Sequence, residues 1–138
     1  MNVKQVIVIR KDLKMRRGKE IAQGSHSSMA HLTHRLISLV NKYNGVKSDD
    51  VGNLIRSNFT DAEWEWMDGS FAKVTLQVEN EQDLRDIFGK AKAAGLEAHL
   101  IIDSGRTEFN GVPTATAVGI GPDEADKINV VTGGLKLY

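Results

Sequence analysis

Short apolar runs with the period of β-strands recur along the chain. Residues 4–10 read KQVIVIR, a β-branched run bounded by charge, which predicts a strand buried on both faces. Residues 71–78 alternate between apolar and polar side chains, as a half-buried strand does. The runs AHLIID over residues 98–103 and TATAVGI over residues 114–120 also have the length of strands. The pattern therefore predicts four strands.

Helical spacing separates these strands. Between residues 19 and 43, hydrophobic side chains recur every three or four positions, which predicts one long helix that ends at Asn44-Gly45. The face expected to pack in the core consists of Ile21, Ser25, Met29, Leu32, Leu36, Leu39 and Val40. Residues 80–94 predict a second amphipathic helix, because acidic side chains occupy its first turn and Gly95 follows its end.

Shorter helices are predicted where the periodicity is weaker. Ser48-Asp49-Asp50 suits the N-cap of a short helix that runs through Arg56, and Thr60 suits the start of another. A third short helix is expected over residues 122–128, before the closing segment LKLY.

The order of these elements indicates the fold class. Strands that alternate with helices favour the α/β class, here a three-layer α/β/α sandwich. The connection from residue 103 to residue 114 is too short for a helical crossover, so the last two strands are expected to pair antiparallel in a mixed four-stranded sheet. We see no repeat or domain boundary, and residues 1–138 are expected to form a single domain.

Composition narrows the class of protein. The 138 residues include no Cys, which excludes disulfides, thiol nucleophiles and Cys-bound metals. The apolar stretches are far shorter than the roughly 20 residues that cross a membrane, and the N-terminus lacks the features of a signal peptide. We therefore expect a soluble, cytoplasmic protein with no membrane partner.

The charge is balanced overall but not along the chain. Lys and Arg together number 18, as do Asp and Glu. Ten of the basic residues and only two acidic ones lie in residues 1–47, and six of the ten lie in residues 10–19. This asymmetry favours binding to a polyanion or to an acidic substrate. A charged loop that is simply solvated would have the same composition.

The basic segment continues into the start of the long helix. A glycine-containing basic loop before a helix suits an anion, because unpaired N–H groups and the helix dipole both favour negative charge. The segment 14–26, KMRRGKEIAQGSH, lacks the spacing of a Walker A motif, and an ordinary helix start is the alternative. Lys19, Gln23 and His26 share one stripe of this helix.

Two further stretches carry candidate polar groups. Asp103 ends the predicted strand 98–103, at the edge where α/β sheets bind ligands. The alternative is that Asp103 only begins a turn and caps Gly105. Thr114 and Thr116 lie two residues apart in the last strand and so face the same side, although Thr is common in strands.

The histidines and tryptophans have plainer interpretations. His31 and His34 can share a helix face, but no further ligand is spaced to complete a zinc site, so no metal is expected. His26 either enters a site or packs its helix. Trp64 and Trp66 are expected to pack partly in the core and partly at an interface, and a stacking platform for RNA bases is the alternative.

Taken together, these stretches resemble the type-two peptidyl-tRNA hydrolases. The matching segments are RKDLKMRRGKEIAQGSHSSM after the first strand, IIDSGRTEF, GVPTATAVGIGP and VTGGLKLY, in that order. The resemblance spans nearly the whole chain except residues 45–68, which we interpret as a helical insert that varies within the family. It implies an α/β enzyme that cleaves the ester between a peptide and the terminal ribose of tRNA. The family is usually dimeric and needs no metal or other cofactor.

The resemblance also implies the residues of the site. The catalytic positions of the family fall on Lys19, Gln23, Asp103, Thr107 and Thr116. The basic residues expected to contact the RNA are Lys14, Arg16, Arg17, His26 and Arg106. The chain departs from the family by a Ser in place of Ala after Asp103, and by one extra residue between Thr107 and Thr116.

The chemistry agrees with these residue types. Ester hydrolysis passes through a tetrahedral oxyanion, so Asp103 would orient or deprotonate water, and Lys19 would bind either the oxyanion or a phosphate. The rival hypotheses are a noncatalytic module that binds tRNA or nucleotides, and an adaptor that recruits another protein through Trp64 and Trp66.

Overall fold

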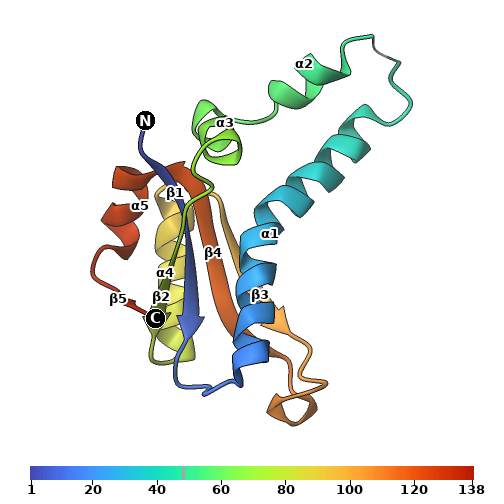
Figure 1. Cartoon of the computed structure of the whole chain (residues 1–138). Helices are drawn as coiled ribbons and strands as arrows, with labels where there is room; N and C mark the ends of the chain where they lie inside the picture. Colours follow the sequence, from blue (N-terminus) through green and yellow to red (C-terminus); the bar gives the residue numbers. More distant parts are fainter. Residues whose placement is uncertain (48) are drawn as a thin grey trace.

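In the computed structural model, which describes residues 1–47 and 49–138, five strands form one sheet with helices on both faces (Figure 1). The strands are β1 (Val3–Arg10), β2 (Lys73–Val78), β3 (Ala98–Asp103), β4 (Thr114–Glu124) and β5 (Lys136–Leu137). The helices are α1 (Arg17–Tyr43), α2 (Val51–Arg56), α3 (Asp61–Asp68), α4 (Glu81–Ala93) and α5 (Ala125–Thr132), and the 3₁₀ turn η1 (Phe109–Gly111) precedes β4. The predicted α/β class is confirmed.

The sheet is mixed, as predicted. The strands lie in the order β3-β4-β1-β2-β5. β1 pairs parallel with β2 and antiparallel with β4, and β3 pairs antiparallel with β4. β1, β2 and β3 therefore end at the same edge of the sheet. The end of α1 at Asn44, the caps of α3 by Thr60 and of α4 by Asn80, and the bounds of β3 agree with the sequence analysis.

The prediction of four strands is wrong, because β5 adds a fifth beside β2. β5 has two residues, which is too short for the alternating pattern that predicts a strand. It is held by partners far away in sequence, since the Gln77 side chain donates a hydrogen bond to the Leu137 carbonyl over 2.7 Å.

The short helix predicted over residues 122–128 is also misplaced. β4 continues to Glu124, and α5 begins only at Ala125. Pro122 lies where the pairing between β1 and β4 shifts register, so its missing N–H breaks no regular ladder bond.

The two faces of the sheet have separate cores. Side chains of β1 alternate between them. Val6 and Val8 pack with residues of α4 and α5, whereas Ile7 and Ile9 pack with Met15 on the face that α1 covers. The central strand is thus buried on both sides, as its apolar run predicts.

The predicted packing face of α1 is wrong. Leu39 is buried, but four members of that face are more than half exposed, namely Ile21, Met29, Leu36 and Val40. The helix instead turns a largely polar stripe toward the sheet, made of Gln23, Ser27, Ala30 and His31. Gly119 of β4 makes this contact close, because a side chain there would collide with the backbone of Ser27.

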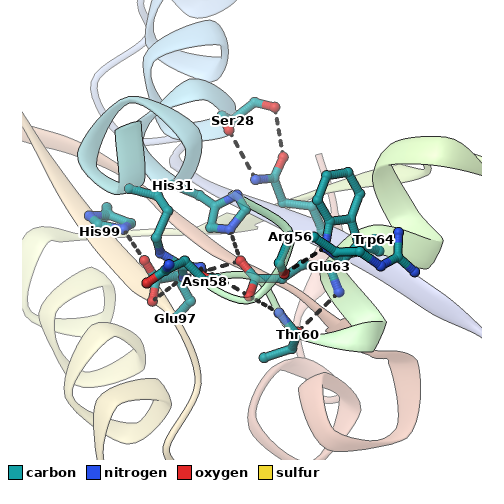
Figure 2. A network of polar contacts seen from close by, with 11 residues as sticks. Ser28, His31, Arg56, Asn58, Thr60, Glu63, Trp64, Glu97 and His99 are labelled. Carbon is teal, nitrogen blue, oxygen red and sulfur yellow. Dashed lines mark hydrogen bonds and ion pairs between the residues drawn. The ribbon is translucent and has the colours of Figure 1, made fainter. Parts of the chain in front are cut away.

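A buried polar network joins α1 to α3 (Figure 2). The ring of His31 is hydrogen-bonded to the carboxylate of Glu63, which also pairs with Arg35 at 3.1 Å. Glu63 accepts the backbone N–H of Thr60, whose hydroxyl accepts the N–H of Glu63 in a capping box. Burial alone would raise the pKa of Glu63, but these hydrogen bonds outweigh it and lower that pKa to about 2.

Residues 49–68 contain α2 and α3, and the interpretation of residues 45–68 as an insert that varies within the family stays a prediction. Asp50 caps α2 by accepting the N–H of Asn53, while Ser48 of the predicted cap lies outside the described residues. Trp66 is fully buried and donates its ring N–H to Ala72, so it cannot stack on RNA bases. Within the described residues, no helix combines the length and hydropathy needed to cross a membrane.

Candidate active site

Polar side chains from four segments meet where β3 ends. Asp103 is the last residue of β3, and Lys19 and Gln23 come from the first two turns of α1. Thr107 lies on the loop after β3, and Thr116 lies in β4. The structure therefore brings together all five residues that the sequence assigns to catalysis.

Asp103 is the centre of this cluster. Its Oδ1 accepts hydrogen bonds from Lys19 Nζ at 2.7 Å and from Gln23 Nε2 at 3.3 Å. Its Oδ2 accepts the backbone N–H of Gly105 at 2.8 Å. The contact with Gly105 confirms the turn that is one interpretation of Asp103, and its role in binding a ligand stays a prediction.

Lys19 and Gln23 are themselves held by threonine hydroxyls. The Lys19 ammonium lies 3.1 Å from Thr107 Oγ1. Thr116 donates to Gln23 Oε1 over 2.6 Å, in a place where both side chains are almost fully buried. Because the amide oxygen of Gln23 faces Thr116, its Nε2 is turned toward Asp103.

An irregularity in β4 allows Thr116 to reach Gln23. Ala117 pairs with Ile101 and Ala115 pairs with Ile102, so Thr116 is an extra residue in the ladder. Its hydroxyl points toward α1, whereas Thr114 donates to the carbonyl of Val112. The member of the threonine pair that belongs to the cluster is therefore Thr116.

The cluster keeps Asp103 ionised. The hydrogen bond from Lys19 lowers the pKa of Asp103, burial opposes that effect, and the Gly105 N–H and the charge of Lys19 add to the lowering. The side chains of Asp103 and Lys19 are only 11% and 14% exposed, so their interaction is poorly screened by solvent.

A cavity of about 480 Å³ adjoins the cluster. Its lining residues are Arg16, Gly18, Lys19, Ala22, Thr107 and Glu108. Arg16 Nε pairs with Glu108 at 3.0 Å across this cavity, although the Arg16 side chain is 81% exposed. The cavity reaches the cluster through Lys19 and Thr107, and Asp103 lies behind the Lys19 ammonium. An ammonium can stabilise an oxyanion and a carboxylate can orient water, which are two functions used in the hydrolysis of an ester.

The sequence matches a known family over almost its whole length. The sequence model of the family "Peptidyl-tRNA hydrolase PTH2" matches residues 3–138. The chain belongs to the PTH2 family of peptidyl-tRNA hydrolases. The predicted family and enzyme class, a hydrolase of the ester bond in peptidyl-tRNA, are thereby confirmed.

Curated relatives of this PTH2 chain cover nearly all of it. A peptidyl-tRNA hydrolase of Methanococcus maripaludis strain C6 is 38% identical over 133 residues, which is 96% of this chain and 97% of that protein. One from Methanocaldococcus jannaschii is 36% identical and covers 98% and 99% of the two chains. A probable peptidyl-tRNA hydrolase 2 of Schizosaccharomyces pombe is 36% identical over 98% of this chain and 56% of its own length.

A solved structure also resembles the PTH2 chain in fold. It is a protein of unknown function from Agrobacterium tumefaciens strain C58, with a TM-score of 0.52 and 13% identity, and it covers 100% of this chain and 98% of its own. At that identity the likeness concerns the fold alone.

The basic residues predicted to bind RNA are more scattered than the polar cluster around Asp103. Only Arg16 lines the cavity. The others are exposed at the surface: Lys14, Arg17, His26 and Arg106. Since His26 is exposed, its alternative role in helix packing is wrong.

Sequence reasoning missed Glu108, the partner of Arg16 in this PTH2 site. Its position one residue after Thr107 is the signal that could have found it. In the described part of the chain, no group of three or more His, Cys, Asp or Glu side chains is arranged to hold a metal ion. That the reaction needs neither metal nor other cofactor stays a prediction.

Proposed function

We propose that Asp103 and Lys19 carry out the hydrolysis of the ester between peptide and tRNA, on a three-layer α/β/α scaffold. The observation that carries this proposal is the 2.7 Å contact between the Lys19 ammonium and Asp103 beside a cavity of about 480 Å³. The scissile carbonyl enters at this cavity and meets both groups.

The two charged groups divide the work. Asp103 orients a water molecule toward the carbonyl carbon and accepts its proton as the bond forms. A carboxylate whose pKa is lowered is a weak base, so orientation is its larger contribution. The carbonyl oxygen becomes an oxyanion, and Lys19 has one N–H free of Asp103 and Thr107 to stabilise it. When the intermediate collapses, the bond to the ribose oxygen breaks and that oxygen takes up the proton.

The neutral side chains position these charges. Gln23 holds Asp103 from α1, Thr116 sets the orientation of the Gln23 amide, and Thr107 shares the Lys19 ammonium. Gln23 and Thr116 are almost fully buried, so they position the charges from behind rather than facing the cavity.

The exposed basic residues serve the RNA. Contacts to the phosphates of tRNA come from Lys14, Arg16, Arg17, His26 and Arg106. Lys19 is excluded from this set, because its ammonium is only slightly exposed and already bound to Asp103. Affinity for tRNA then falls as salt rises, since each phosphate contact releases counterions.

The protein acts as a homodimer in the cytoplasm. The family resemblance supports this assembly, as does an apolar groove of about 540 Å³ between the second half of α1 and helices α2 and α3. Leu36 and Val40 on α1 and Val51 on α2 line this groove and are more than half exposed. Leu36→Glu is expected to convert a dimer to a monomer in light scattering after gel filtration, and an unchanged mass would place the interface elsewhere.

The test of the catalytic proposal is the release of an N-acetylated amino acid from tRNA, with and without a chelator. Asp103→Asn and Lys19→Ala are each expected to lower kcat at least tenfold while circular dichroism stays unchanged. Release that the chelator leaves intact supports a cofactor-free site. Normal turnover in both variants refutes the assignment, and tRNA binding without release by the unaltered protein identifies a noncatalytic module.

A further inference from the structure

Tyr138 lies against the helix that carries the catalytic lysine. Its backbone N–H donates to Thr75 of β2 over 3.0 Å. Its ring packs on the face of the sheet that α1 covers, with the apolar side chains of Ile7, Ile9 and Met15. The chain ends beside β2, so this ring covers part of the sheet face on which α1 lies.

The phenol of Tyr138 is tied to the first turn of α1. It donates a hydrogen bond to the carboxylate of Glu20, the residue after Lys19. Burial, and then the neighbouring Glu20, raise the pKa of Tyr138, so the phenol keeps the proton that it donates. The Lys11 ammonium lies over the face of the Tyr138 ring, 4.1 Å from its centre. The charged groups that face Tyr138 are therefore Glu20 from α1 and Lys11 from the loop after β1.

The first turn of α1 needs such a contact. Its N-cap is Arg16, which makes no side-chain capping hydrogen bond. Helix ends without caps fray, and the local free energy of opening is smallest there. Glu20 projects about 100° around the helix from Lys19. The contacts of Lys19 with Asp103 and of Glu20 with Tyr138 therefore hold this turn from two directions and fix its rotation.

We propose that Tyr138 is a positioning residue that acts through Glu20 to keep the Lys19 ammonium on Asp103. The inference rests on the proposed function, because it assigns a cause to the geometry of that site. It gives a role to the segment LKLY, which lies outside the catalytic cluster.

The proposal makes a specific kinetic prediction for Tyr138→Phe, which keeps the ring and removes the hydrogen bond. We expect kcat to fall roughly three- to tenfold, the range of one hydrogen bond, with KM changed less than twofold. The acid limb of the kcat profile should also move to higher pH. The groups that face Asp103 are Lys19 and Gln23 from α1 and the Gly105 N–H from its own loop. Of these only Lys19 is charged, so a looser Lys19 raises the pKa of Asp103.

Variants of Glu20 test the same contact from the other side. Glu20→Gln keeps an acceptor for the phenol and is expected to retain kcat within twofold. Glu20→Ala should reproduce the defect of Tyr138→Phe, and combining Glu20→Ala with Tyr138→Phe should cost no more than either alone.

The matched control is Tyr43→Phe. Tyr43 lies at the other end of α1, and its hydroxyl accepts a hydrogen bond from Asn58 over 3.0 Å. This variant should leave kcat and the acid limb unchanged. Hydrogen exchange gives a readout without activity: amides of residues 17–24 should exchange faster in Tyr138→Phe but not in Tyr43→Phe.

Three outcomes would overturn the proposal. One is unchanged kcat and exchange in Tyr138→Phe, and another is an equal defect in Tyr43→Phe. The third is a raised KM with kcat intact, which would assign Tyr138 to RNA binding. If Tyr138→Phe does not fold, full activity of Glu20→Ala refutes the proposal by itself. Failure of the unaltered protein to release peptide would instead refute the proposed function, and the exchange result would still stand.

Discussion

The hydrogen bond between Thr116 and Gln23 offers the sharpest test of the site. Thr116→Val replaces a hydroxyl by a methyl group of nearly the same size, so the shape of the buried contact is preserved. The substitution removes the donor that lies 2.6 Å from Gln23 Oε1. Thr116 is 0% and Gln23 1% exposed, so water cannot replace the lost partner. A buried acceptor is left unpaired.

Two magnitudes follow from this geometry. An unsatisfied buried acceptor costs about 1–3 kcal/mol of folding free energy, which lowers the melting midpoint by on the order of 5 °C in a domain of this size. Turnover should fall as well, because the amide of Gln23 loses the contact that turns its nitrogen toward Asp103. One neutral hydrogen bond of about 0.5–1.5 kcal/mol corresponds to a roughly three- to tenfold loss in kcat.

The assay compares three variants by initial rates of ester hydrolysis and by thermal unfolding. Thr116→Ser keeps the hydroxyl and should retain most of the activity. Thr132→Val makes the same exchange at another buried threonine, whose hydroxyl donates to Ile128 in α5, and should leave kcat unchanged. Full activity of Thr116→Val would refute the role of the hydroxyl. Loss in Thr116→Ser as large as in Thr116→Val would show that packing of the methyl group matters as much as the hydrogen bond.

Three further predictions concern the surroundings of the site. Replacing Arg16 and Arg17 with Ala should raise KM and weaken its dependence on salt. The slope of log KM against log salt concentration should fall by about 0.7 for each phosphate contact that is lost. An unchanged slope in a salt titration would exclude RNA contact at these residues. Gly105→Ala should lower kcat, because residue 105 has a φ of +80° and an added Cβ meets the backbone of Val112; unchanged rates would show that the clamp on Asp103 is dispensable. The lowered pKa of Glu63 stabilises the fold fully above about pH 4.5, and this stability is lost as the pH falls toward 2. In the unaltered protein this loss of unfolding free energy amounts to about 3 kcal/mol. Urea unfolding at several pH values should show a smaller loss in Glu63→Gln. An unchanged loss would show that other carboxylates cause the pH dependence.

Part of the polar cluster around Asp103 could be anticipated from the sequence, because some of its signals are local. Lys19 and Gln23 are four residues apart on a helix, and Asp103 ends an apolar run of strand length. The parallel arrangement of β1 and β3 then brings both segments to one edge of the sheet. The family resemblance added Thr107 and supplied the proposed roles of all five residues. The irregularity in β4 explains why Thr116, and not Thr114, reaches Gln23.

The orientation of α1 could not be predicted in this way. Periodicity assumes that the apolar side of a helix is the buried one. Here Gln23 and His31 are buried against partners far away in sequence: Thr116 donates to the Gln23 amide, and Glu63 is hydrogen-bonded to Nε2 of His31. Such long-range partners leave no trace in the pattern of a single helix. The fifth strand was not predicted for a similar reason, since its two residues depend on pairing with β2.

The absence of a side chain at Gly119 has a consequence for how the two cores evolve. Because α1 meets main chain at Gly119, the spacing between helix and sheet at that point is set by backbone atoms. Substitutions among the aliphatic residues beneath α4 and α5 act on the opposite face of the sheet. Sequence drift on that face can therefore change the stability of the protein while Lys19 and Asp103 keep their separation.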